Sequence, residues 1–383
     1  MSRLFTLLLS FILAAMLASG DDPAGVGVDL IGTDGGRPGT HDAPAPASQE
    51  TRPDFPGNAR HVLAGMVADP LLGSMESIGY IDFDDEAVDN DSVLAVELNL
   101  VLDYAYGDTT SVVLLRLSDM TEDWPPNAPS DTTFTAGPEV LLFSATGEDS
   151  LVSIRMPQNW VLEKQDILRD PDFRNLFHGF EFRPVEGNAV LGANADVSAM
   201  RMLTATDTLV FPVNKNMTTL TREPAGPLPA GSVLVQDGFG DAVRLDIDFS
   251  DVPLGAVNRS ILSVPLDNAG LQQSAPPNFV RPLIDLVDLV AIEEDGTVLT
   301  SIRASTARDG DRLILESELL VQDIQNMRLG RSSISHFVLV ARRGSSQLDP
   351  PPFSPADNSV SALLVRTDES DYPYVLLTLT SPE

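Results

Sequence analysis

Hydrophobic residues recur at every second position along much of the chain. The pattern is clear in seven segments, which are residues 92–102, 110–117, 151–156, 242–249, 260–266, 336–342 and 374–380. These segments are rich in Val, Leu, Ile and Thr and are bounded by Gly, Pro, Asn and Asp, as β-strands are. In the run Val-Glu-Leu-Asn-Leu at 96–100, the apolar side chains share one face and the polar ones the other. The pattern predicts strands with one buried face and one wet face.

Helical periodicity is sparse. Residues 162–176 suit one or two helical turns, but Pro171 interrupts them. Residues 319–329 suit a short helix that ends before Gly330. Strands and helices do not alternate regularly, which argues against a parallel α/β sheet. We therefore predict an all-β protein built from antiparallel, jelly-roll-like β-sandwiches.

The two halves of the chain share a weak repeat. Gly-Tyr-Ile-Asp-Phe-Asp at 79–84 and Leu-Asp-Ile-Asp-Phe-Ser at 245–250 each precede a predicted strand. Chance similarity between alternating strands is the competing explanation. A stretch rich in Pro and Gly at 224–231 separates the halves. We predict two β-sandwich domains, over residues 61–223 and 224–383.

The N-terminus has the layout of a secretory signal peptide. Arg3 precedes an apolar run over 4–18, and small residues follow it. We predict a signal peptide over residues 1–20, cleaved after Gly20, and no transmembrane span in the mature chain; an uncleaved anchor is the alternative. Asp21 stands where a bacterial lipoprotein would carry its acceptor cysteine, so the chain as written cannot be lipidated by that route.

The residues after the predicted cleavage site have the composition of a linker. Residues 21–60 are rich in Gly, Pro, Asp and Ala. Such a composition favours a flexible chain over a packed element. We predict that this acidic segment is a tether to the folded part.

The charge balance is strongly acidic. Asp and Glu number 56 against 24 Lys and Arg, which gives a formal net charge of -32, and only two of the basic residues are lysines. This excess would repel a nucleic acid backbone, and it disfavours a basic patch for anionic lipid. Because the acids are spread along the whole chain, we interpret them as adaptation to high salt, with cation sites as the alternative. The 43% hydrophobic content is enough for a buried core.

Candidate catalytic residues are scarce. The chain has no cysteine, which excludes disulfides, thiol nucleophiles and Cys-type zinc sites. No two of the four histidines stand at metal-ligand spacing, and neither a Gly-x-Ser-x-Gly elbow nor a phosphate-binding glycine loop is present. The sequence therefore predicts no catalytic residue.

Two groups of residues remain as candidate binding sites. Acidic side chains crowd one turn after a predicted strand: Asp82, Asp84, Asp85, Glu86, Asp89 and Asp91. Their oxygens suit calcium, which takes six to eight such ligands; a solvated turn is the alternative. The aromatic rings of Trp124, Tyr104 and Tyr106 are candidates for stacking on a sugar, against ordinary packing in the core.

Two resemblances add to this interpretation. Ile-Asp-Phe-Ser-Asp-Val-Pro-Leu-Gly-Ala-Val-Asn-Arg-Ser-Ile-Leu at 247–262 resembles the opening of DNRLRE and disaggregatase-related jelly-roll domains, some of which are classed as carbohydrate-binding modules. Over most of residues 60–383 the chain also resembles a family of uncharacterised Bacteroidota surface lipoproteins, a domain of unknown function. The second resemblance is carried by the Phe-x-Gly segment at 176–182 and by Leu-Thr-Leu-Thr at 377–380. It implies a surface location and transfers no catalytic residue.

These observations lead to one main hypothesis and one alternative. The main hypothesis is an exported, non-enzymatic cell-surface or secreted protein. It would act as a binding or structural module, with polysaccharide or a cell-envelope protein as its partner. The alternative is an exported hydrolase that acts on glycans, for which two carboxylates would have to face each other across a cleft. Calcium is the one cofactor that the sequence suggests.

Overall fold

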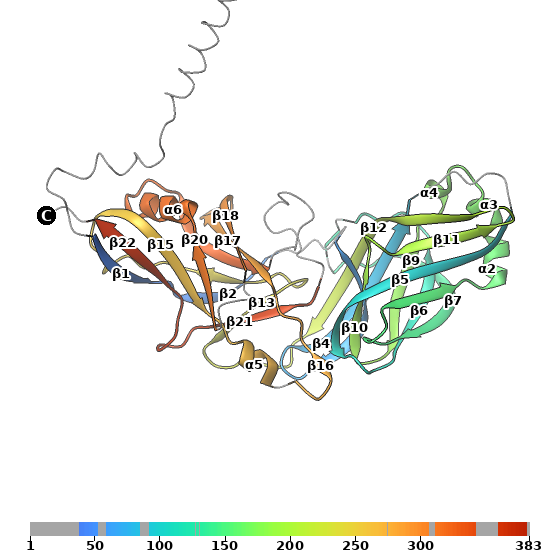
Figure 1. Ribbon diagram of the computed structural model, residues 1–383, viewed down its shortest axis with the longest axis horizontal. Helices are drawn as coiled ribbons and strands as arrows, with labels where there is room; N and C mark the ends of the chain where they lie inside the picture. Colours follow the sequence, from blue (N-terminus) through green and yellow to red (C-terminus); the bar gives the residue numbers. More distant parts are fainter. Residues whose placement is uncertain are drawn as a thin grey trace, which may run out of the picture.

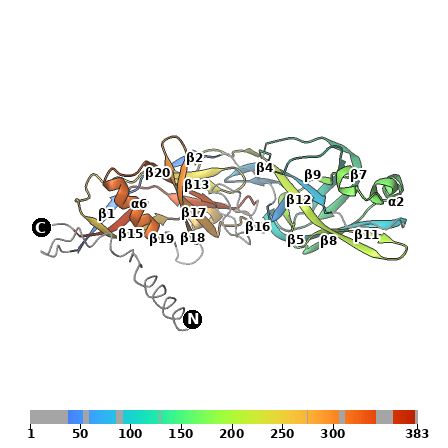
Figure 2. The same cartoon turned by 90° about the horizontal axis from the view of Figure 1, so that it is seen from above.

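The computed structural model describes residues 38–52, 59–84, 92–126, 128–129, 131–273, 275–305, 311–341 and 359–380. It consists mostly of β-strands in several antiparallel sheets, which confirms the predicted all-β sandwich fold. Each of the seven segments with alternating hydrophobicity contains a strand. The strands form two bodies that lie end to end along the long axis (Figures 1 and 2).

The first sandwich is made from a single sheet. It contains β3 (His61–Asp69), β4 (Gly73–Phe83), β5 (Val93–Asp108), β6 (Val113–Met120), β7 (Ala136–Ala145), β8 (Leu151–Arg155), β9 (Phe180–Glu186), β10 (Ala189–Asn194), β11 (Ala199–Thr204) and β12 (Thr208–Glu223). The short strand β16 (Phe279–Val280), from the second half of the chain, joins this sheet by pairing with β5. The sheet has 11 strands in total.

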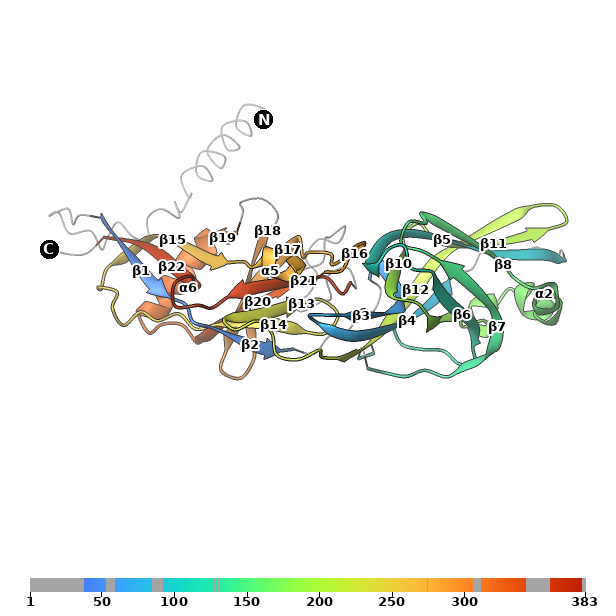
Figure 3. The same cartoon turned by 90° about the horizontal axis from the view of Figure 1, so that it is seen from below.

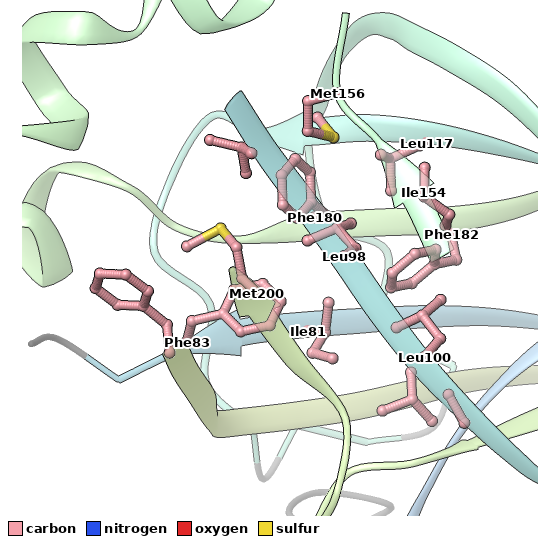
Figure 4. Packing of buried hydrophobic residues seen from close by; sticks show 14 of the residues in the cluster. Ile81, Phe83, Leu98, Leu100, Leu117, Ile154, Met156, Phe180, Phe182 and Met200 are labelled. Carbon is pink, nitrogen blue, oxygen red and sulfur yellow. The ribbon is translucent and has the colours of Figure 1, made fainter. Parts of the chain in front are cut away.

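This sheet folds over on itself around an apolar core. Figure 4 shows Phe83 of β4, Leu98 of β5, Leu117 of β6 and Phe180 of β9 pointing toward one another. Along β5, Val96, Leu98 and Leu100 are buried and alternate with the partly exposed Glu97 and Asn99, as the sequence pattern predicts. The β12 strand pairs with both β11 and β4, so it bridges two parts of the folded sheet.

The second sandwich contains two separate sheets. A sheet of 4 strands has the order β1 (Pro38–Pro44), β22 (Tyr374–Thr380), β15 (Ala256–Pro265) and β19 (Arg312–Glu316). A sheet of 7 strands contains β18 (Val298–Ser305), β17 (Leu286–Glu293), β20 (Ile334–Ala341), β14 (Asp241–Leu245), β13 (Ser232–Gln236), β21 (Ala362–Arg366) and β2 (Ala47–Thr51). Their inner faces enclose a second apolar core.

The structure corrects the prediction of a tether over residues 21–60. Residues 1–37 and 53–58 lie outside the described residues, but 38–51 form β1 and β2. The β1 strand pairs with β22 over its whole length, and β2 pairs with β14. Ala43 and Ala45 are fully buried at the corner between the two strands. Small side chains and nonlocal backbone hydrogen bonds hold this segment, and neither leaves a strong local pattern.

The first sandwich is therefore an insertion within the second. The chain begins the second sandwich with β1 and β2, builds β3 to β12 of the first, and then returns to β13. Figure 3 shows β1 and β22 side by side at the end of the molecule that is remote from the first sandwich. The main change of sheet between β12 and β13 falls at the Pro- and Gly-rich stretch that the sequence indicated.

Helices are few and short. The region expected to hold broken helical turns, residues 162–176, contains α3 (Gln165–Leu168) and α4 (Phe173–Leu176), and α2 (Gln158–Glu163) ends just inside it. The expected helix before Gly330 is α6 (Glu318–Arg328), which Ser317 caps by accepting a hydrogen bond from Leu319 N–H. A further helix, α5 (Asn268–Gln273), precedes β16. In the part of the chain that the structure describes, no helix is long and apolar enough to cross a bilayer.

Candidate functional site

The ring of Trp124 is buried and cannot stack on a sugar. The residue lies in the loop after β6, as expected, but its side chain is only 1% exposed. Its indole N–H donates to the carbonyl oxygen of His178 at 2.9 Å, and its ring packs against Tyr80 and Phe134. The loop folds back over the sheet face. The ring that the sequence context suggested would be exposed therefore packs into a small apolar cluster.

Tyr104 and Tyr106 both lie where the two sandwiches meet. Tyr106 is fully buried, and its hydroxyl donates to the carboxylate of Asp69. Tyr104 is half-buried, and its hydroxyl accepts from the backbone N–H of Val360 in the second sandwich at 3.1 Å. Burial raises the pKa of both phenols, so both stay protonated. Full burial of Tyr106 contradicts its predicted stacking on a sugar, whereas the ring of Tyr104 is partly exposed and its ligand role stays a prediction.

The contact between the sandwiches is a buried joint. An apolar cluster there unites Leu63, Val190 and Leu220 of the first sandwich with Leu234 and Leu364 of the second, among others. Because this cluster contains residues from both sandwiches, the two bodies share one apolar core where they meet.

An ion pair lies inside this joint. The guanidinium of Arg281 donates to both carboxylate oxygens of Asp69, at 2.6 and 2.8 Å, and both side chains are fully buried. Burial alone would raise the pKa of Asp69, but hydrogen bonds from Arg281, Tyr106 and two backbone N–H groups lower it overall. The pair is a planar, bidentate one, the geometry in which a buried ion pair is best satisfied.

The predicted calcium ligands are only partly described. Asp85, Glu86, Asp89 and Asp91 lie outside the described residues. Asp82 and Asp84 contact basic side chains, with Lys215 Nζ 3.3 Å from Asp82 Oδ2 and Arg174 3.6 Å from Asp84. Among the described residues, no three His, Asp or Glu side chains gather as a metal site would require. The calcium site stays a prediction, and the chain's own cations neutralise the two carboxylates that can be placed.

A polar pocket opens beside Asp82. It has a volume of about 230 Å³ and is lined by Asp82, Asp123, Arg174, Asn175, His178, Asn214 and Lys215. The residues come from four places: the end of β4, the loop after β6, α4 with the turn that follows it, and the middle of β12. Their side chains supply both hydrogen-bond donors and acceptors. We call this hollow the polar pocket.

A β-bulge in β12 shapes the pocket. Val213 pairs with Phe83 and Lys215 pairs with Asp82, so Asn214 is an extra residue opposite β4. A bulge of this kind re-aims side chains and is frequent beside functional sites. It lets Asn214 and Lys215 both line the hollow, although neighbours on a regular strand would point to opposite faces.

Lys215 is the central charge of the pocket. Its ammonium donates to Asp123 Oδ1 at 2.6 Å, lies 3.3 Å from Asp82 Oδ2, and sits 4.4 Å from the ring centre of Trp124. Burial raises the pKa of Asp82 although Lys215 opposes the shift. The hydrogen bond from Lys215 lowers the pKa of Asp123, which is mostly exposed. One lysine therefore holds two carboxyl groups whose pKa values are displaced in opposite directions.

A second, wider hollow lies on the outer face of β3, β4 and β12. It has a volume of about 310 Å³, and its lining includes Met66, Ser74, Glu76, Thr221 and Glu223. This hollow lacks the lysine, arginine and histidine side chains that line the polar pocket. We therefore take the polar pocket as the candidate functional site.

Most of this site was missed at the level of the sequence. Asp82 was singled out, but for a metal, and Trp124 lies beneath the site instead of in it. One signal was available: the chain has only two lysines among 24 basic residues, and one of them is Lys215. No protein-family model matches the chain, and a search of curated proteins found no match.

Proposed function

We propose that the chain is an exported, non-enzymatic β-sandwich protein, secreted or at the cell surface, which binds a hydroxyl-rich ligand of the polysaccharide class. The polar pocket is the observation that carries the proposal, because donors and acceptors from four separate segments converge on it. Sugar hydroxyls both donate and accept hydrogen bonds. Carboxylate, amide and basic side chains in one hollow are therefore suited to them.

The architecture supports a role in presentation. The second sandwich carries β1 and β22 at one end and the first sandwich at the other. A leader or anchor that precedes β1 would thus hold the second sandwich near the envelope and point the polar pocket outward. The surface-lipoprotein resemblance accords with this arrangement and stays a prediction.

The size of the pocket limits what it would take. At about 230 Å³ it is smaller than the 300–1,000 Å³ typical of pockets that enclose a whole drug-sized ligand. We expect it to hold one sugar residue at the end or at a branch of a polysaccharide. A cell-envelope protein is the competing partner, and nucleic acid is disfavoured by the net charge of -32.

The geometry of the polar pocket supports a glycan hydrolase less well than a glycan-binding protein. Asp82 and Asp123 both contact Lys215 Nζ, so the contacting oxygens lie within about 6 Å of each other, a separation that two-carboxylate glycosidases use. In such enzymes, however, the scissile bond lies between the carboxyl groups. Here the Lys215 side chain occupies that position, which favours binding over hydrolysis.

A glycan array in high salt tests the proposal. The chain without its predicted leader is compared with the double variant Arg174→Ala/Asn175→Ala and with Asn214→Ala, all of which change exposed side chains at the pocket. We expect the wild type to bind a defined set of glycans and each variant to lose at least about tenfold in affinity, the effect of one or two hydrogen bonds. Incubation of the bound glycan with wild-type protein, followed by analysis of reducing ends, tests for hydrolysis.

The matched control is Arg201→Ala, an exposed change on the outer face of β11, away from the pocket. It should bind as the wild type does. Equal binding by the pocket variants, or no glycan binding by any form, would overturn the proposal. New reducing ends would establish the hydrolase instead.

A further inference from the structure

The strongest further observation concerns Lys215 and Asp82 themselves. The two residues stand directly opposite each other on the paired strands β12 and β4. Lys215 Nζ lies 3.3 Å from Asp82 Oδ2, and the Asp82 side chain is almost fully buried. A third group, the carboxylate of Asp123, accepts a hydrogen bond from the same Nζ at 2.6 Å. An amine, a buried carboxyl group and a second carboxylate thus meet at one point.

The choice of lysine at this position is informative. The chain uses arginine for nearly all of its positive charges and has lysine at only two positions, 164 and 215. Arginine is the better partner where an ion pair alone is needed, because its planar fork binds a carboxylate bidentately. The structure uses it so in the joint, where Arg281 pairs with Asp69. Lysine differs in having a primary amine, which can become a nucleophile and form a stable amide.

We propose that Lys215 and Asp82 condense to an isopeptide bond, a covalent cross-link between β12 and β4. The Nζ–Cγ bond forms, the bond from Cγ to one carboxyl oxygen breaks, and one water molecule leaves. The ammonium and the carboxylate together supply every atom of the amide and the water, so the step needs no oxidant, reductant or other reactant. The net charge of the pair is zero before and after.

The surrounding groups have defined roles in this step. Asp123 accepts a proton from the Lys215 ammonium, which frees the lone pair of Nζ, and passes it to the carboxylate of Asp82. As the Nζ–Cγ bond forms, Nζ releases a second proton, which Asp123 carries to the same oxygen so that it departs as water. Burial raises the pKa of Asp82, which favours the neutral carboxyl group, a better electrophile than the carboxylate. The ring of Trp124, whose centre lies 4.4 Å from Nζ, covers one side of the amine. The polar pocket beside the pair gives the released water a way out.

The inference does not rest on the proposed ligand. The cross-link would fix the register of β4 against β12 at the bulge, whether or not the pocket then binds a glycan. It would also close a covalent loop between two residues that are far apart in the sequence, a constraint that acts mainly on the unfolded chain.

Mass spectrometry of the purified full mature chain tests the proposal. We expect an intact mass lower than the sequence mass by that of one water molecule. After proteolysis, the peptides that contain Asp82 and Lys215 should be found joined. The Lys215→Arg variant should show the full sequence mass. In the Asp123→Ala variant, all or most of the molecules should show the full sequence mass.

Two further variants make the result specific. Lys164→Arg is the matched control, because Lys164 also contacts a carboxylate, Asp119 at 2.9 Å, yet that carboxylate is held by the indole N–H of Trp160. This variant should keep the mass deficit. Asp82→Asn should lose the mass of ammonia in place of water. Separate, unmodified Asp82 and Lys215 peptides from the wild type would overturn the proposal, even if a variant fails to fold.

Discussion

At the residue scale, the most instructive side chain is Trp124. Its sequence context, before two prolines, predicts a loop, and the loop is present. Exposure of the ring is a different property, because it depends on which surface the loop covers. Here the ring closes an apolar cluster with Tyr80, Met120 and Met217. No local sequence pattern indicates such a contact. The sequence therefore predicted the position of Trp124 in a loop correctly, but not the burial of its ring.

Replacing this ring should destabilise the fold. For Trp124→Ala we expect the free energy of unfolding to fall by about 3–5 kcal/mol, the usual cost of removing a large buried aromatic side chain. Urea titration followed by circular dichroism measures the change. The control is Leu254→Ala, which alters a side chain that is 78% exposed and should change stability by less than about 0.5 kcal/mol. A stable Trp124→Ala protein would contradict the packing role.

The buried pair of Asp69 and Arg281 gives a prediction about pH. The pKa of Asp69 is lower in the folded protein than its ordinary value of 3.8. A carboxyl group of this kind stabilises the fold above its unfolded pKa, and the contribution disappears as the pH falls through the folded pKa. We therefore expect the free energy of unfolding to drop below about pH 4.

The Asp69→Asn variant isolates this contribution. It should lose about 3–5 kcal/mol near neutral pH, because Arg281 is left as a buried, unpaired charge. Its stability should also depend less on pH below about 4 than that of the wild type. Urea titrations across this pH range provide the measurement, and parallel pH curves for the two proteins would refute the assignment.

At the element scale, the alternation of apolar residues was a reliable guide to strands. It located β5, β6, β8, β14, β15, β20 and β22, because each has a continuous inward face. It failed for β1 and β2. The one buried residue of β1 is the small Ala43, β2 has no buried residue, and their partner strands β22 and β14 lie far away in the sequence. The polar pocket could not be predicted for the same reason. It depends on the pairing of β4 with β12 and on a bulge that only the register reveals.

The turn that carries His178 into the pocket depends on a glycine. Gly179 has a φ of 81°, and a Cβ there would collide with the carbonyl oxygen of Ile81. We expect Gly179→Ala to cost about 3 kcal/mol, from backbone strain and the clash together. Gly296→Ala is the control, since Gly296 has a φ of 89° but open space around it, and strain alone should cost about 1 kcal/mol. Chemical denaturation measures the loss in free energy of unfolding for each variant. Equal losses would show that the close approach of Gly179 to β4 does not contribute.

At the scale of the whole molecule, the joint should make the two sandwiches unfold together. Both tryptophans lie in the first sandwich, so their fluorescence reports on that body, whereas circular dichroism reports on all the strands. We expect the two signals to change in a single shared transition in the wild type, because the bodies share an apolar cluster and a buried ion pair. In Arg281→Met the transitions should separate. Separate transitions in the wild type would mean that the joint couples the sandwiches only weakly.

The acidic surface should make stability depend on salt. The net charge of -32 repels itself at low ionic strength, and the Debye length shrinks to about 3 Å near 1 M salt. We therefore expect the urea midpoint to rise between about 0.1 M and 1 M KCl. Sorbitol at equal osmolarity is the control, because it raises osmolarity without screening charge. A midpoint that falls with KCl would contradict the interpretation of the acids as salt adaptation.

The insertion of one sandwich within the other imposes an order on biosynthesis. The β1 strand is made before the inserted sandwich, and its partner β22 is made after it. During synthesis, the inserted body can complete most of its sheet while the host body still lacks its closing strand. The host is therefore the half that a chaperone or a protease would meet unfinished, and loss of β22 would leave β1 without its partner strand.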